Sequence, residues 1–345
     1  MKKNNTLIVD LDNTITVESR LFEYPEKPLN NEVRRSIINA SKYFNIHIFT
    51  ARNMKSLDGD LDKILKITKP IAKKWLKQNN VEYDEITFGK PFCGKHGFYI
   101  DDKNLSIEEF NFKFGNPYWE KSFDIVIPFY NEEENIYSIY NDVKRLERLF
   151  NIEKYYFINN GSSDNSNIIF DDLVNRDEKI EIVNIEKNIG YGFGVKAGLK
   201  KSKSDFVIIN HSDKQFDTYS YFITNMIDIM NLSSADTIFS YRLNRTLKQR
   251  IITKILNVIL SIFTLKIIKD FNGQPKVINM NNLKKDIEFL PNDFSLDFSI
   301  YKKLKPNYFL PVIQKNREKG ESSWSNGDFF KKLSILNMYI KESFK

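Results

Sequence analysis

The first hundred residues alternate short apolar runs, rich in branched and aromatic side chains, with longer amphipathic stretches. Short apolar runs between polar turns are typical of strands, whereas apolar positions at helical spacing predict helices. We therefore expect strands at 6–10, 45–50, 85–88 and 97–100, and helices near 31–43 and 68–79. This alternation predicts a mostly parallel α/β sheet.

The same pattern restarts at Phe123, after a break at residues 111–121 where Gly115 and Pro117 interrupt the periodicity. Beyond the break we expect strands at 123–128, 155–159, 181–184 and 205–210, helices near 133–149, 164–175 and 191–201, and a long helical region after 245. The sequence thus predicts two α/β domains, divided into a first domain at 1–112, a linker at 113–121, a second domain at 122–327 and an amphipathic basic helix at 328–345.

The most apolar stretch of the chain is 251–268. Its uncharged centre, from Ile255 to Leu265, is well short of the ~20 residues that a membrane-spanning helix needs. We expect no spanning segment, and the N-terminus lacks the pattern of a signal peptide. Two interpretations remain open: the stretch packs against the second domain, or it inserts shallowly at a membrane surface, assisted by Lys254, Lys266 and the basic tail.

Length, net charge and cysteine content bear on the number of domains, the partners and the location of the protein. A chain of 345 residues exceeds the usual size of one core, which agrees with two domains. The net charge of +7 favours anionic partners such as phosphates, nucleotides or an acidic membrane, or it reflects a solvated lysine-rich surface. Charge is the only indication of nucleic-acid binding, which we do not expect. The single cysteine, Cys93, excludes an internal disulfide and indicates a reducing, cytoplasmic location, with peripheral attachment to the inner face of the membrane left open.

Candidate chemistry first occurs directly after the run 6–9, at Asp10 and Asp12. An extended backbone sends side chains two residues apart to the same side. At the carboxyl end of a parallel strand they would face the crevice where open α/β sheets bind ligands. A Mg²⁺ ion would relieve their repulsion and attract a phosphate. One carboxylate can then attack phosphorus while its neighbour handles the proton of the leaving oxygen.

Three further features follow in order: Thr50 at the end of a second apolar strand, Lys90 in Gly-Lys-Pro, and the acidic pair Asp101 and Asp102. This set resembles the four motifs of phosphatases of the haloacid-dehalogenase (HAD) superfamily, over roughly residues 5–110. The residues around these motifs are similar to those of small capless members of the superfamily from bacterial capsule and lipopolysaccharide gene clusters. The resemblance implies that Asp10 is the nucleophile, Asp12 the general acid/base, and Thr50 and Lys90 the groups that hold the phosphoryl group. It also implies an Mg²⁺ site formed by Asp10, Asp12, Asp101 and Asp102.

A second cluster occurs at Val126–Glu132, where a strand ends in Tyr130 and Glu132. An aromatic ring and a carboxylate at a strand end can hold a base and its ring N–H groups. Asn160 follows the next predicted strand, and Asp213 follows a later one as a candidate metal ligand. Residues 188–192 start a helix whose backbone N–H groups suit a phosphate.

The segments 270–276, 294–297 and 317–324 follow this cluster in the order seen in polyprenyl-phosphate sugar transferases. Roughly residues 122–325 therefore resemble glycosyltransferase family 2, which has the GT-A fold. The resemblance implies a nucleotide pocket lined by Pro128, Tyr130, Glu132 and Asn160, an Mg²⁺ or Mn²⁺ ion on Asp213, and phosphate contacts from Arg242, Arg317 and Lys319. Asn159, Asn160 and His211 stand where this family usually has aspartates, which reduces the negative charge around the ion.

Together these features predict a bifunctional enzyme of bacterial surface polysaccharide (capsule or lipopolysaccharide) biosynthesis. A capless HAD-like Rossmannoid domain would remove phosphate from a small sugar or polyol phosphate with Mg²⁺. A GT-A domain would transfer a sugar from a nucleotide-sugar donor to a polyprenyl-phosphate or glycan acceptor at the membrane surface. In the alternative interpretation only one half is catalytic and the other is a degenerate binding or scaffold domain.

Overall fold

The computed structural model describes residues 5–17, 23–93, 103–234, 236–306, 308–315 and 329–344. The chain divides into two compact units, Met1–Trp119 and Glu120–Lys345, so the division falls inside the stretch 113–121. Part of the predicted chemistry lies outside the described residues, namely the strand at 97–100 and the side chains of Asp101, Asp102, Arg317 and Lys319.

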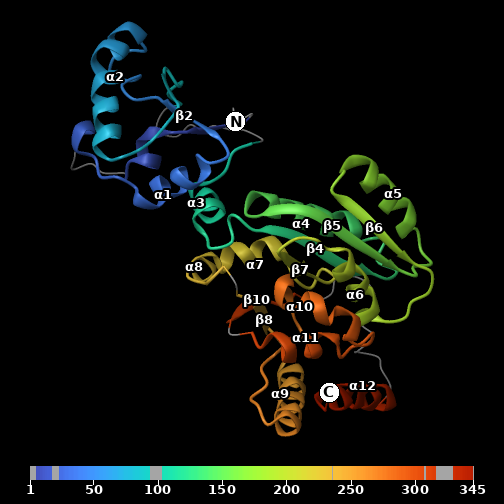
Figure 1. Cartoon of the computed structure of the whole chain (residues 1–345). Helices are drawn as coiled ribbons and strands as arrows, with labels where there is room; N and C mark the ends of the chain where they lie inside the picture. Colours follow the sequence, from blue (N-terminus) through green and yellow to red (C-terminus); the bar gives the residue numbers. More distant parts are fainter. Residues whose placement is uncertain are drawn as a thin grey trace. The chain divides into compact units, whose positions relative to one another are not determined.

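The first unit contains a three-stranded parallel sheet in the order β1-β2-β3 (Figure 1). The strands are β1 (Thr6–Val9), β2 (Asn45–Thr50) and β3 (Glu85–Phe88). Val9 pairs with Ile48, and Thr50 pairs with Phe88. Because all three strands run in the same direction, their carboxyl ends meet at one edge of the sheet.

The helices of this unit are α1 (Asn31–Ala40), α2 (Leu61–Gln78) and α3 (Ile107–Gly115), with short turns η1 (Leu11–Ile15) and η2 (Tyr24–Glu26). Helix α2 begins seven residues before the predicted start at 68, because the Asp60 side chain caps it by accepting the N–H of Lys63 at 3.1 Å. One core joins the sheet to the helices through buried side chains that include Ile37, Ile48 and Trp75.

The second unit is built on a seven-stranded sheet in the order β10-β8-β9-β7-β4-β5-β6. Its strands are β4 (Ser122–Phe129), β5 (Asn151–Asn160), β6 (Ile180–Ile185), β7 (Phe206–Ile209), β8 (Ile238–Leu243), β9 (Gly273–Asn279) and β10 (Tyr308–Ile313). Strands β7, β4, β5 and β6 are mutually parallel, and β9 runs antiparallel to β7 and β8. The chain moves outward from β4 to β5 and β6 and then returns to the other side of β4 at β7. Such a reversal of strand order opens a crevice at the carboxyl ends of the flanking strands.

The helices of the second unit are α4 (Ile136–Lys144), α5 (Ser166–Arg176), α6 (Tyr191–Lys201), α7 (Thr218–Thr224), α8 (Met226–Met230), α9 (Leu247–Thr264), α10 (Met280–Leu283), α11 (Leu296–Leu304) and α12 (Phe329–Ser343), with turns η3 (Arg145–Arg148) and η4 (Lys284–Phe289). Helix α12 buries Ile335 and Tyr339 in the same core as β4 and β7. Within the stretch 251–268, Leu260 and Ile268 lie in this core and Leu256 packs against it, whereas most other large apolar side chains of α9 are exposed, so the stretch packs only in part against the second domain. None of the helices in the described part of the chain combines the length and the apolar character that crossing a bilayer requires.

Gly198 sets how closely α6 approaches the sheet. A Cβ atom at Gly198 would lie 2.5 Å from Val126 Cγ1 and 3.1 Å from Ile158 Cδ1. We expect Gly198→Ala to destabilise the second unit by about 1–3 kcal/mol, because a packed core resists an added methyl group. Gly194→Ala in the same helix is the control, since its nearest neighbour would be Pro128 Cβ at 3.3 Å. Calorimetric unfolding that showed equal losses for both variants would contradict this packing argument.

Candidate functional site

In the first unit, the predicted side chains meet at the carboxyl edge of the small sheet. Asp10 follows β1, Thr50 ends β2, and Lys90 follows β3 after Gly89. Asp12 lies in the tight turn η1, which Asn13 closes with a positive φ of 59°. Asparagine accepts this left-handed conformation more readily than most residues. The turn therefore places the second carboxylate beside the first.

The contacts among these residues combine anionic and cationic groups. Lys90 Nζ lies 3.0 Å from Asp10 Oδ2, and the Thr50 hydroxyl donates to Asp12 Oδ2 at 3.4 Å. Burial raises the pKa of Asp10, whereas its hydrogen bond and ion pair with Lys90 act in the opposite direction. The predicted nucleophile is thus a partly desolvated carboxylate with a neutralising cation in direct contact.

Sequence analysis assigned no role to Arg52, although the structure places it in this cluster. The Arg52 side chain is fully buried, and its Nη2 and Nε atoms donate to Asp12 Oδ1 at 2.7 and 3.1 Å. Its guanidinium carbon lies 4.6 Å from the centre of the Tyr24 ring, while Nη1 has no hydrogen-bond partner in the described part of the chain. A buried donor without a partner is costly, so Nη1 is a candidate contact for a substrate oxygen. The arginine two residues after the strand-ending Thr50 was the available signal.

In the second unit, the loops after β4 and β5 are joined by hydrogen bonds. The Asn131 N–H donates to the Ser162 hydroxyl at 3.1 Å, and the Asn131 side chain accepts the Ser163 N–H at 2.8 Å. Figure 1 shows β4 and β5 side by side. The predicted Pro128, Tyr130, Glu132 and Asn160 therefore share one edge of the sheet. Tyr130 is 48% exposed, as a ring that stacks on a ligand requires.

The two neighbouring asparagines at the end of β5 differ in what their amides do. Asn159 is used structurally: it donates to Asn167 Oδ1 at 2.5 Å and accepts the Ser162 N–H at 3.1 Å. Asn160 donates to the Gly190 carbonyl at 3.1 Å, but its buried Oδ1 has no hydrogen-bond partner among the described residues. Asn160 Oδ1 is therefore an acceptor at this edge that a ligand N–H would satisfy.

The turn after β7 contains Asp213 and His211. Asp213 Oδ1 accepts the N–H of Gln215 at 3.2 Å, which fixes the carboxylate within the turn. Desolvation lowers the pKa of His211, so the imidazole is neutral at pH 7, and its Nε2 lies 3.3 Å from the Tyr191 hydroxyl. A neutral imidazole places no positive charge beside Asp213.

A buried polar network lies behind this turn, and sequence analysis did not assign roles to its members. Lys276 is fully buried, and its Nζ lies 3.2 Å from Asp297 Oδ2. The Tyr191 hydroxyl lies 3.4 Å from Asp297 and 3.3 Å from the Gln274 amide. When the Gln274 amide is oriented so that both its oxygen and its nitrogen have hydrogen-bond partners, its oxygen accepts a hydrogen bond from Lys276 Nζ at 2.6 Å. The network thus fixes Tyr191, the hydroxyl that contacts His211.

Two groups that the sequence predicts to contact phosphate already have other partners in the structure. Arg242 forms a two-pronged ion pair with Asp270, with Nε–Oδ2 at 2.9 Å and Nη2–Oδ1 at 2.8 Å. In the stretch 188–192 at the start of α6, the Gly190 N–H donates to Asn188 Oδ1 at 2.9 Å and so already has a partner. The role of Arg242 in phosphate binding stays a prediction, with Asp270 as its observed partner.

The metal sites also stay predictions. Within the described residues, no group of three or more histidine, cysteine or acidic side chains is placed to hold an ion. Mg²⁺ usually binds through one or two carboxylates and completes its shell with water and substrate phosphates. Asp213 in the second unit and the pair Asp10 and Asp12 in the first fit that kind of site.

Comparison with known proteins identifies the family of the second unit. The sequence profile described as "Glycosyl transferase family 2" matches residues 124–304, which span β4 to α11. An uncharacterized glycosyltransferase of Bacillus subtilis, YkcC, is 27% identical over 94 residues, which make up 27% of this chain. The aligned region covers only 29% of that relative's length.

Two solved structures are similar to parts of the chain. Glucosyl-3-phosphoglycerate synthase from Mycobacterium tuberculosis, in complex with Mn²⁺, UDP and glucosyl-3-phosphoglycerate, has a TM-score of 0.50. It is 12% identical, and the match covers 72% of this chain and 85% of that one. A target protein from Vibrio cholerae is 40% identical, with coverage of 31% and 87% and a TM-score of 0.30. The first likeness shows that the second unit has a GT-A-like fold, as the sequence predicts.

The buried ion pair between Lys276 and Asp297 gives a stability prediction. We expect Asp297→Asn to destabilise the second unit by about 3–5 kcal/mol, because it leaves the Lys276 charge buried without its partner. Asp286→Asn is the matched control: Asp286 lies 3.1 Å from Lys303 in a more exposed pair, and we expect a loss of about 0.2–1 kcal/mol. Urea unfolding measures both variants. A loss for Asp297→Asn no larger than that of the control would contradict the prediction.

Proposed function

The chain belongs to glycosyl transferase family 2, and we propose that its second unit transfers a sugar from a nucleotide-sugar donor to a lipid-linked or glycan acceptor. The observation that carries this proposal is the convergence of Tyr130, Asn160 and Asp213 at the edge where the strand order reverses, within the matched region. The Mn²⁺ and UDP named in the M. tuberculosis complex support a divalent ion and a uridine-type nucleotide as the first ligands to test.

Each residue at this edge has a distinct proposed role. Asn160 Oδ1, a buried acceptor without a partner among the described residues, takes the N–H of the base, and Tyr130 offers its exposed ring for stacking. Pro128 and Glu132 complete the nucleotide pocket, and Arg242, Arg317 and Lys319 remain predicted phosphate contacts. Asp213 would hold Mg²⁺ or Mn²⁺, which neutralises charge on the leaving diphosphate as the bond from the anomeric carbon to the donor oxygen breaks.

For the first unit we propose a HAD-type phosphatase of a small sugar or polyol phosphate. The supporting observation is the meeting of Asp10, Asp12, Thr50 and Lys90 at three parallel strand ends. Asp10 attacks phosphorus, the bond to the leaving oxygen breaks, and Asp12 delivers a proton to that oxygen. Thr50 and Lys90 stabilise charge on the transferred group. Mg²⁺, with Asp101 and Asp102 as further predicted ligands, would neutralise the phosphate.

Arg52 acts through Asp12 in this proposal. Its fork orients the carboxylate until a substrate phosphate competes for the guanidinium. Nη1, which has no partner within the part of the chain that the structure describes, would receive that phosphate. Both activities in one chain suggest sequential steps of bacterial surface polysaccharide synthesis, which is the proposed pathway.

The phosphatase proposal predicts that Asp10→Asn lowers turnover of p-nitrophenyl phosphate with Mg²⁺ by ~10³-fold or more, because the nucleophile is lost. Nucleotide-sugar turnover by the same protein should be unchanged. Asp58→Asn makes the same chemical change at an exposed position and should leave both activities at the wild-type level. Full phosphatase turnover in Asp10→Asn would eliminate the proposed nucleophile, and loss of both activities would contradict two independent sites.

The transferase proposal predicts that Asp213→Ala abolishes the turnover of nucleotide sugars that depends on a divalent ion. The metal affinity should fall by more than the ~10–100-fold typical of losing an outer-shell partner. The control is Asp228→Ala at an exposed position of α8. A titration of Mn²⁺ against turnover measures the effect. Wild-type metal dependence in Asp213→Ala would remove Asp213 from the metal site.

A further inference from the structure

Helix α9 presents an apolar stripe to the outside of the second unit. Of its 18 residues only Leu260 is buried, although most of its large side chains are apolar. Five of the exposed apolar side chains recur at intervals of four or three residues, which places them on one face of the helix. They are Leu247, Ile251, Ile255, Val258 and Ile262, and Ile252 and Phe263 of the same helix are also exposed.

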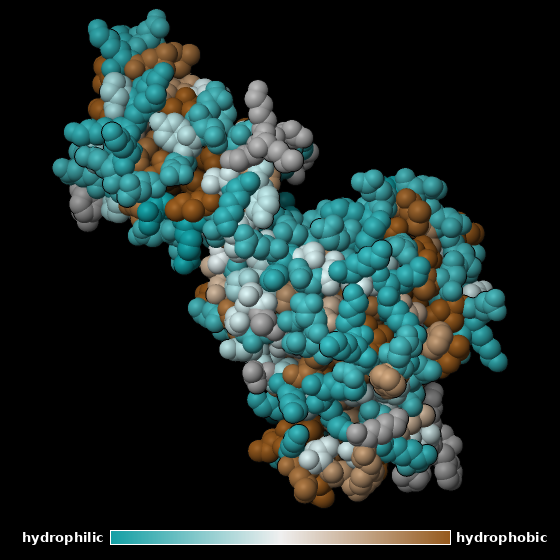
Figure 2. All heavy atoms as spheres, viewed as in Figure 1, coloured by the Kyte–Doolittle hydropathy of each residue, from teal (hydrophilic) through white to brown (hydrophobic). Residues whose placement is uncertain are grey.

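The exposed apolar surface continues beyond the helix. Leu265 ends α9 in a left-handed conformation and is 91% exposed, and Ile267 is 86% exposed. Ile268 then returns to the core. Figure 2 shows hydrophobic atoms gathered over the end of the molecule where Figure 1 labels α9. A cluster of exposed apolar side chains on this scale marks an interaction surface, whereas isolated exposed apolar side chains do not.

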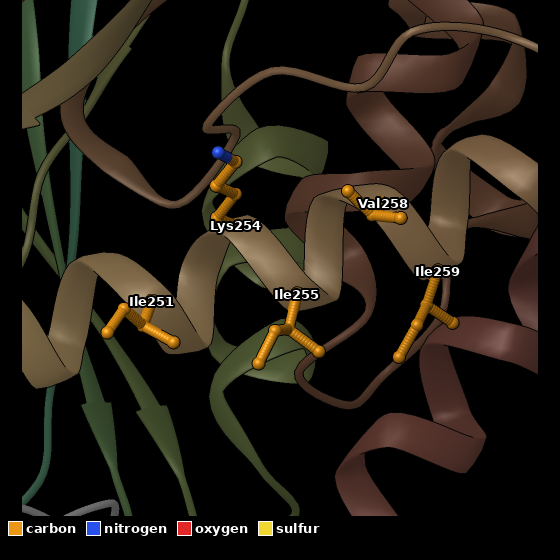
Figure 3. A pocket seen from close by; sticks show the side chains of 5 residues that line it. All are labelled: Ile251, Lys254, Ile255, Val258 and Ile259. Atoms are coloured by element: carbon orange, nitrogen blue, oxygen red, sulfur yellow. The ribbon is translucent and has the colours of Figure 1, made fainter.

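The segment of the sequence that contains this stripe carries charge of a single sign. Between Asp236 and Asp270 the chain contains no acidic residue and seven basic ones, namely Arg242, Arg245, Lys248, Arg250, Lys254, Lys266 and Lys269. In Figure 3, Ile251, Ile255 and Ile259 extend to one side of α9, whereas the amino group of Lys254 extends away from them. Together with Val258 these residues line a shallow apolar groove that belongs to α9 alone. Apolar side chains flanked by long basic ones suit the boundary between acyl chains and anionic head groups.

We propose that α9 and the following residues 265–267 dock the second unit on an anionic lipid bilayer, with the helix axis in the plane of the interface. The apolar stripe enters the acyl boundary, and the basic side chains contact the lipid phosphates. Charge complementarity selects this occupant over a second copy of the chain. A symmetric contact through this face would bring two sets of basic residues together without acidic partners.

Docking through this stripe has a consequence for the acceptor, because of where the stripe lies relative to the candidate site. This consequence rests on the proposed transferase function. Arg242 precedes α9 in the chain and Asp270 follows it. The ion pair between these two residues joins the two ends of the segment that contains α9, and this pair is the base of the segment. The neighbouring Leu243 carbonyl accepts the Gln314 N–H at 3.4 Å, and the following Lys315 N–H donates to the Gln215 carbonyl at 2.8 Å, which links this base to the Asp213 turn. An acceptor phosphate carried by a membrane lipid would therefore meet the site at the bilayer surface, which favours the lipid-linked acceptor class.

Co-flotation of the full chain with vesicles tests the docking. We expect binding to vesicles of phosphatidylcholine mixed with phosphatidylglycerol, weaker binding to phosphatidylcholine alone, and loss of the difference in high salt. The double variant Ile255→Gln with Ile262→Gln should bind mixed vesicles ~10-fold less tightly, or weaker still. Ile168→Gln with Ile227→Gln is the matched control, because these isoleucines are 69% and 77% exposed elsewhere on the unit. The control should bind as the wild type does.

Three results would overturn the proposal: no wild-type binding to mixed vesicles, unchanged binding by the α9 variant, or an equal loss in the control variant. Sedimentation velocity adds a fourth, a wild-type dimer that the α9 substitutions abolish. Turnover of a soluble nucleotide sugar without vesicles should be the same in the α9 variant and the wild type. Failure of docking and failure of the transferase proposal are therefore measured separately.

Discussion

Parallel strand pairing is the constraint on which both candidate sites depend. In a parallel sheet every strand ends at the same edge, so polar residues that follow separate strands are brought together although they are far apart in sequence. In the first unit this edge gathers Asp10, Thr50 and Lys90. In the second it gathers the turns after β4, β5 and β7, and a reversal of strand order such as the one beside β4 is where open α/β sheets bind ligands.

The charged groups of the two candidate sites are paired in different ways. In the first unit, Lys90 contacts Asp10 and the Arg52 fork contacts Asp12, so both carboxylates already have cationic partners. In the second unit, a buried Lys276–Asp297 pair lies behind a neutral His211, and Asp213 is held by a backbone N–H. In the proposed site Asp213 would bind a divalent ion. A histidine at position 211, where the resembled family usually has an aspartate, is consistent with an ion that takes its remaining ligands from a diphosphate.

Local patterns in the sequence were sufficient for most strands, because apolar runs and the polar turns after them are short-range signals. The ranges 45–50 and 85–88 match β2 and β3, and the GT-A-like fold of the second unit is confirmed. Partners from distant elements were not accessible: Arg52 meets Asp12 from a neighbouring strand end, and Lys276 meets Asp297 from a helix. Sequence also did not distinguish Asn159, whose amide braces a turn, from Asn160, whose buried oxygen has no partner within the described residues. The HAD-like assignment of the first unit stays a prediction.

Hydrogen–deuterium exchange of the intact chain, with a panel of nucleoside diphosphates and Mn²⁺ or Mg²⁺, tests whether a nucleotide binds at this edge of the second sheet. We predict that one nucleotide, only with a divalent ion, slows exchange in the turns after β4, β5 and β7, where Tyr130, Asn160 and Asp213 lie. Exchange around Asp10 in the first unit should be unchanged. Protection confined to other segments, or no protection by any nucleotide with either ion, would contradict a nucleotide-sugar site at this edge of the sheet.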